Sequence, residues 1–108
     1  MTTAYKRLAA LRPADTSEAE LYEVPASTEA IVTLNICNQD TSERAYDVAY
    51  TDVDGAASGE DWLISGKAIP ANETHQIVGI AMPAASTLRV KASVADKISF
   101  IAFGMEIS

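Results

Sequence analysis

The sequence predicts an all-β protein: a single antiparallel β-sandwich, or jelly-roll-like domain, of about eight strands. Two observations carry this prediction. Apolar and polar residues alternate with a period of two over most of the chain, which is the pattern of a half-buried strand. Turn-forming residues recur at intervals of about 8 to 12 residues, and no amphipathic helix of useful length interrupts them. The length of 108 residues is that of one domain, so we expect residues 1–108 to fold as one unit.

The first predicted strand lies close to the N-terminus. The segment from Tyr5 to Leu11 is predicted to be a strand that ends before Pro13, a residue that is tolerated only at the margins of a sheet. We therefore expect residues 1–12 to form an edge strand or an N-terminal arm. The polar segment 15–20 is predicted to be a loop with room for one helical turn, and "ELYEV" a short strand that ends at the turn beginning with Pro25.

Two strands of the middle segment have a clear apolar face. These faces consist of Val32, Leu34 and Ile36 in "EAIVTLNICN", and of Tyr46, Val48 and Tyr50 in "RAYDVAYTDV". The lone cysteine, Cys37, and Asn38 mark the end of the first of these strands. The glycine-containing segment 54–59 is predicted to be a flexible loop, and "DWLISGKAI" a strand with a bulge at its glycine.

The last three predicted strands are "ETHQIVGIAM", "TLRVKASV" and "KISFIAFGMEI". In the second of them Leu88, Val90 and Ala92 point inward, and Arg89 and Lys91 point outward. The third places Ile101, Phe103, Met105 and Ile107 on one face, with Phe100 on the opposite face.

Charge is distributed unevenly along the chain. Eight Lys and Arg stand against fifteen Asp and Glu, a formal net charge of −7, which argues against nucleic acid or an anionic membrane as a partner. Three of the basic residues, Lys6, Arg7 and Arg12, lie within residues 1–12, where there is no acid. Such a basic strand on an acidic body could dock on an acidic partner or a neighbouring copy, or it could simply be solvated.

Compartment signals are few. No apolar run is long enough to span a membrane, and the N-terminus lacks the pattern of a secretory signal. A single cysteine excludes an intramolecular disulfide and fits a protein made in a reducing cytoplasm.

Catalytic and metal-binding signatures are weak, so we expect no enzyme activity and no cofactor. A nucleophilic pair would have to combine Cys37 or a serine with His75, the only histidine, and none of these sits in a catalytic motif. The acidic loop from Asp52 to Asp61 contains Asp-x-Asp-Gly, but Leu63 stands where a calcium loop needs its glutamate. Trp62, which follows that loop, is either a core residue or an exposed anchor for a protein or a sugar.

Several short motifs together resemble those of small bacteriophage virion proteins. They are "LYEVPAST" (21–28), "ICN" (36–38), "IPANET" (69–74) and "FIAFGMEI" (100–107), along with the "AYKRLA" start. The resemblance covers nearly the whole chain, and its motifs are turns and strand ends. It implies a non-enzymatic β-sandwich built into the virion, with no catalytic residue to carry over.

The expected function follows from this resemblance. The leading hypothesis is a capsid decoration or cement protein that is assembled in the host cytoplasm and binds other virion proteins, such as the major capsid protein. A symmetric homo-oligomer, with a trimer as one candidate, is expected to use the N-terminal strand for contacts. The predicted interaction residues are Tyr5, Lys6, Arg7, Arg12 and Trp62. The alternatives are a tail, baseplate or fibre-attachment component, and a carbohydrate- or calcium-dependent binding module.

Overall fold

The computed structural model describes residues 2–108 as eight strands in two four-stranded sheets, which confirms the predicted all-β sandwich. The strands are β1 (Thr3–Leu11), β2 (Ala19–Glu23), β3 (Glu29–Asn38), β4 (Arg44–Thr51), β5 (Trp62–Ile69), β6 (Thr74–Met82), β7 (Thr87–Ala92) and β8 (Ile98–Ile107). Within residues 2–108 there is no helix that could cross a membrane.

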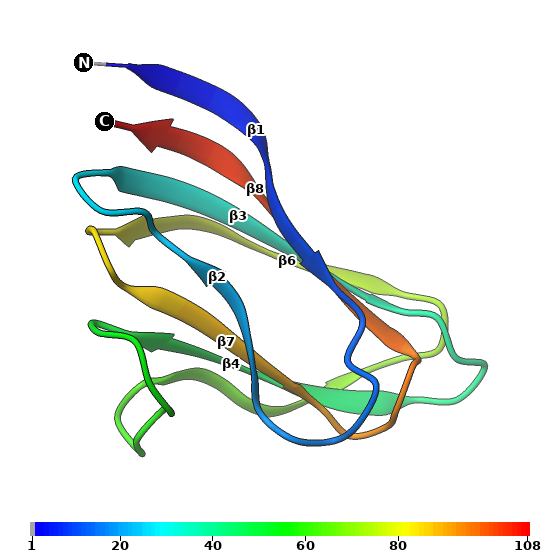
Figure 1. Ribbon diagram of the computed structural model, residues 1–108. Helices are drawn as coiled ribbons and strands as arrows, with labels where there is room; N and C mark the ends of the chain where they lie inside the picture. Colours follow the sequence, from blue (N-terminus) through cyan, green and yellow to red (C-terminus); the bar gives the residue numbers. More distant parts are fainter. Residues whose placement is uncertain (1) are drawn as a thin grey trace.

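The strand order defines a jelly roll. Sheet A has the order β1-β8-β3-β6 and sheet B the order β2-β7-β4-β5, and all pairs are antiparallel. The first strand pairs with the eighth, the second with the seventh, the third with the sixth and the fourth with the fifth. One long antiparallel ribbon folded over on itself produces this order, which is that of two Greek keys. Figure 1 shows the two layers, with both chain ends beside each other at one end of the sandwich.

The core lies between the sheets and follows the predicted alternation. Sheet A contributes Val32, Leu34 and Ile36, and sheet B contributes Leu88, Val90 and Ala92, all of them buried. Tyr46 and Val48 are also buried, while Tyr50 is half-buried at the margin of the core. The predicted bulge in β5 is present, and Gly66 there has a φ of 63°, which favours glycine.

Strand β8 has two apolar faces, and the face with fewer large side chains is the buried one. Ile98, Phe100 and Ala102 point into the core, while the face that carries Ile101, Phe103, Met105 and Ile107 points away from sheet B. The reason is register: Phe100 lies opposite Ile36, and Ala102 opposite Leu34, and both partners point inward. Residues 14–17 form bends and β2 begins at Ala19, so the segment 15–20 lacks the helical turn that the sequence allowed.

One glycine is required by the close approach of two strands in sheet A. Gly104 of β8 lies opposite Val32 of β3, and a Cβ at this position would collide with the backbone carbonyl oxygen of Ile31. A larger residue would therefore push β8 away from β3. This accounts for the glycine in the terminal motif "FIAFGMEI".

Candidate interaction surface

The outer strand of sheet A, β1, has one edge free of a strand neighbour, because it pairs only with β8. The backbone groups of Thr2 and Ser108 exchange two hydrogen bonds, of 2.7 and 2.8 Å. Since hydrogen-bonded and non-hydrogen-bonded pairs alternate in an antiparallel ladder, the backbone groups of Thr3, Tyr5 and Arg7 point to the free edge. This segment is therefore a ready template for another strand.

A polar link ties β1 to both sheets. Lys6 Nζ lies 3.2 Å from Glu106 Oε1, and the Tyr22 hydroxyl donates a hydrogen bond of 2.5 Å to Glu106 Oε2. The hydrogen bond from Tyr22, with the nearby Lys6 ammonium, lowers the pKa of Glu106 below its ordinary value. Burial, and then the Glu106 carboxylate, raise the pKa of Tyr22. The N-terminal segment is thus anchored to β8 and β2.

The predicted interaction residues do not form one cluster. Tyr5 and Arg7 are exposed on the outer face of sheet A, whereas Lys6, which is exposed as well, lies on the opposite face of β1 and pairs with Glu106. Arg12 donates a hydrogen bond to Gln39 at the other end of the strand. Trp62 begins β5 in sheet B, opposite Ala49, and is half-buried.

Sequence reasoning missed an apolar surface on the outside of sheet A. Four of the six exposed large apolar side chains among the described residues lie there, namely Tyr5, Ile31, Val78 and Phe103. Two shallow grooves of about 310 and 580 Å³ lie next to each other on this side of the molecule. They share Ile31, and Met105 and Ile107 belong to their walls. The alternation in the last strand was the signal: it has two apolar faces, and only one of them can point into the core.

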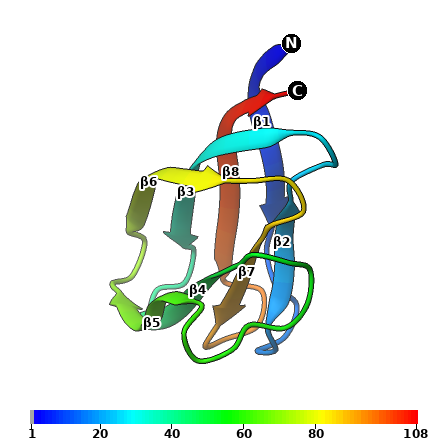
Figure 2. The ribbon, with the colours of Figure 1, turned by 90° about the vertical axis from the view of Figure 1, so that its left-hand side faces the viewer.

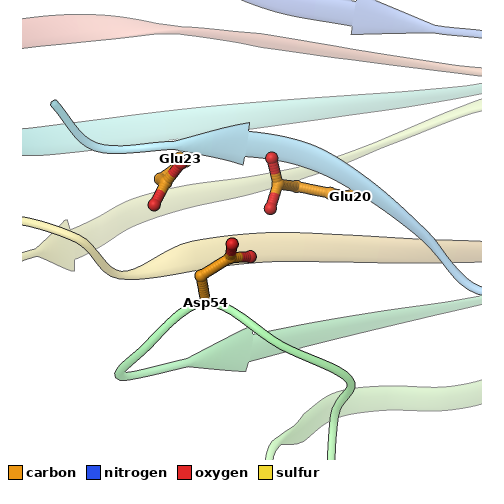
Figure 3. Close-up of side chains that lie close together, drawn as sticks. All are labelled: Glu20, Glu23 and Asp54. Atoms are coloured by element: carbon orange, nitrogen blue, oxygen red, sulfur yellow. The ribbon is translucent and has the colours of Figure 1, made fainter.

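Three carboxylates gather on the outside of sheet B. Glu20 and Glu23 come from β2, and Asp54 comes from the loop after β4, with oxygen atoms within 4.8 Å of one another. Figure 3 shows the three side chains pointing toward one another. A hydrogen bond with Asp54 raises the pKa of Glu20, because two carboxyl groups can share such a bond only when one is protonated.

This cluster differs from the acid set that the loop motif indicated. Of the acids in the segment from Asp52 to Asp61, only Asp54 belongs to it. The Asp61 carboxylate accepts hydrogen bonds from the backbone amide and hydroxyl of Ser58, and Asp52 accepts one from Tyr50. The two glutamates come from a strand more than thirty residues earlier, so loop spacing alone could not find them.

Cys37 and His75 lie on opposite faces of sheet A. Cys37 points to the outer face, and His75 lies opposite Ile36, whose side chain points into the core. Nδ1 of His75 is 2.9 Å from the Tyr46 hydroxyl. His75 therefore cannot serve as the base for Cys37.

The fold is shared with proteins of virus particles and of other origin. No protein-family model matches the sequence, and no curated protein matches it. The structure is similar to a chain of the T13 IBDV viral particle, with a TM-score of 0.56 and 10% identity over 97% of this chain. It is also similar to the tobacco streak virus coat protein, with a TM-score of 0.50 and 8% identity over 94% of this chain.

A third similar structure comes from a bacterium. A chain assigned as an alpha-L-fucosidase from Bacteroides thetaiotaomicron matches 90% of this chain with a TM-score of 0.54 and 16% identity. The present chain spans 30% of the IBDV chain, 85% of the tobacco streak virus chain and 22% of the bacterial chain. At such low identities the likeness establishes a common sandwich fold.

Proposed function

We propose that this protein is a non-enzymatic structural protein of a virus particle, and specifically a bacteriophage capsid decoration protein. The observation that carries the proposal is that nearly the whole chain forms the sandwich shared with the IBDV and tobacco streak virus chains. The resemblance of its turn and strand-end motifs to small phage virion proteins supports the finer assignment. Its partners are then other virion proteins, with the major capsid protein first among them, and further copies of itself.

The contact with the particle is assigned to the free edge of β1. Here the backbone groups of Thr3, Tyr5 and Arg7 can accept a strand from a capsid protein, and Arg7 adds a positive charge to an otherwise acidic molecule. In the described part of the chain Arg7 makes no ion pair. An acidic or neutral strand of the partner would fit this edge best.

Co-sedimentation of the purified protein with particles that lack it tests this contact. The backbone N–H of Tyr5 points to the free edge and not to β8, so Tyr5→Pro removes this donor and leaves the hydrogen bonds between β1 and β8 in place. We therefore expect particle binding to fall at least about ten-fold. Tyr5→Ala is the matched control, because it removes the ring and keeps the N–H. Equal binding by wild type and Tyr5→Pro, with unchanged melting temperature, would rule out contact through this edge.

A tail, baseplate or fibre-attachment component is the second structural candidate, since the same strand edge could dock on a tail protein. The two candidates differ in where the protein lies on the particle. Labelling of particles with an antibody separates them, because a decoration protein labels the head and a tail component labels the tail.

A binding module dependent on calcium or carbohydrate is the candidate from another class. The observation in its favour is the cluster of Glu20, Glu23 and Asp54, since calcium is bound by several carboxylate oxygens. Half-buried Trp62 offers part of its ring for stacking on a sugar. This candidate requires that calcium raise the melting temperature relative to EDTA and that Glu20→Gln abolish the rise. The decoration account expects no such difference.

A further inference from the structure

We propose that the outer face of sheet A is a self-association surface, on which two copies of this chain stack face to face about a two-fold axis near Met105. The role of this contact in a virion rests on the proposed function. The contact itself is a property of the purified chain. The outer apolar face is defined here by Tyr5, Ile31, Val78, Phe103, Met105 and Ile107.

The outer face of sheet A is apolar, and no other element within residues 2–108 covers it. Tyr5 is 80% exposed, Val78 67%, Ile31 47% and Phe103 39%, and all four strands of sheet A contribute one of these residues. Sheet B differs on its outer side, where Arg89 forms ion pairs with Glu18 and Glu20. Clustered exposed apolar side chains on a small domain mark a contact surface.

The distribution of charge favours a second copy as the occupant of this face. The chain carries a net charge of −7, so most pairs of surfaces from two copies repel each other. The outer face of sheet A is different: its outward positions on β1, β8, β3 and β6 include one cation, Arg7, and one anion, Glu29. Two copies can therefore meet on this face without bringing their excess acids together.

These two charges lie at positions that a two-fold axis can pair. Arg7 lies opposite Phe103 on one side of β8, and Glu29 lies opposite Ile107 on the other side. Met105, midway between Phe103 and Ile107, is thus the midpoint of the diagonal that joins the two charges. A two-fold axis through Met105 can bring each Arg7 to the partner's Glu29, with Ile31 near the partner's Phe103.

The dimensions fit a weak but specific dimer. Four strands about 4.8 Å apart, each contributing about eight residues, give a face on the order of 500 Å² per copy, or about 1,000 Å² for the pair. This is near the lower limit for a specific contact, so we expect dissociation in the micromolar range. Within one copy, Arg7 and Glu29 are about 17 Å apart by strand spacing, which is beyond the reach of their side chains.

Sedimentation over a range of protein concentrations tests the contact. Phe103→Glu is expected to raise the dimer dissociation constant at least about 100-fold, because a contact with two-fold symmetry contains the substituted residue of both copies. Leu63→Glu is the matched control: Leu63 is 51% exposed on β5 of the other sheet, and its replacement is expected to leave the constant within about two-fold.

The charge pair supplies the sharper test. Arg7→Glu and Glu29→Arg are each expected to weaken dimerisation about ten-fold, and the double variant is expected to recover wild-type affinity within about three-fold. Since these residues are too far apart to pair within one copy, such a rescue reports a contact between copies. Circular dichroism verifies that each variant is folded.

Three results would overturn the proposal. The first is a wild-type chain that stays monomeric up to about 500 µM, which is far above the expected dissociation constant. The second is an assembly with three-fold symmetry. The third is a double charge variant that dimerises no more tightly than the single variants. In each case particle binding through the β1 edge could still be observed, so failure of the dimer and failure of the proposed function can be told apart.

Discussion

At the scale of single residues, Asn38 joins more segments than any other polar side chain of the core. It is fully buried at the end of β3, and its amide nitrogen donates to the backbone carbonyls of Ser42, Ile69 and Pro70 at 3.0 to 3.3 Å. Its side-chain oxygen accepts a hydrogen bond from the Asp40 amide at 2.9 Å. One side chain therefore holds together the turn after β3 and the end of β5.

Replacing Asn38 by Ala should lower the free energy of unfolding by about 2–3 kcal/mol, because buried carbonyl groups lose their donor. Urea unfolding measures the change. Asn35→Ala is the matched control, since Asn35 lies on the outer face of the same strand, where its side chain accepts a hydrogen bond from Gln76. A loss below about 0.5 kcal/mol is expected. Equal losses in both variants would contradict the role given to Asn38.

The sequence indicates the position of Asn38 but not its role. Placing the end of β3 at Cys37 and Asn38 needed only the local alternation and the turn residues that follow. The hydrogen-bond partners Ile69 and Pro70 lie at the end of β5 and directly after it, about thirty residues later, so they follow from the pairing of strands across the sandwich. For the same reason the separation of Cys37 from His75 could not be derived from composition.

At the scale of elements, β1 is held by its ladder to β8 and by the link of Lys6 and Tyr22 to Glu106. For residues 1–12 we expected an edge strand or an N-terminal arm; β1 lies at the edge of sheet A, and sequence could not say which strand it would join. Likewise, period-two patterning identified both faces of β8 and could not decide which one is inward. That choice depends on the register with β3, where Phe100 lies opposite Ile36.

The carboxylate of Glu106 makes the stability of this element depend on pH. Because the pKa of Glu106 is lowered in the folded state, its contribution is complete above its ordinary value of 4.5 and is lost as the pH falls through the folded value. Glu106→Gln should therefore lose less stability than wild type between pH 7 and pH 3, as measured by melting temperature.

Tyr22→Phe gives a second measure of the same link. It removes the hydrogen bond that is the main cause of the lowered pKa of Glu106, so the pH dependence should flatten in the same direction. If the melting temperature of either variant falls with decreasing pH as steeply as that of wild type, acid destabilises the protein at another site.

At the scale of the whole molecule, the sandwich has two unlike outer faces. Sheet B carries the ion pairs of Arg89 and the acidic cluster, while sheet A presents an apolar face with one charge of each sign. Figure 2 shows both termini at the same end of the molecule, where β1 and β8 extend beyond sheet B. The two proposed contacts, with a particle through the β1 edge and with a second copy through the outer face of sheet A, thus lie next to each other.

The fold class and strand number follow from sequence because turn residues and alternation are local signals. The jelly-roll order does not, since it depends on which distant strands share a ladder. The role of the predicted contact residues stays a prediction: Tyr5 and Arg7 are exposed, and Lys6 is paired with Glu106. The apolar face of sheet A emerged only from the register.

Immunogold labelling of purified virus particles, with an antibody raised against this chain, tests the central claim most directly. The account predicts gold on the head of each particle at many regularly distributed positions, and loss of the label from particles made without this protein. Label confined to the tail would contradict the decoration assignment. Particles that carry no label, while the free protein reacts with the antibody, would contradict a structural role in the virion.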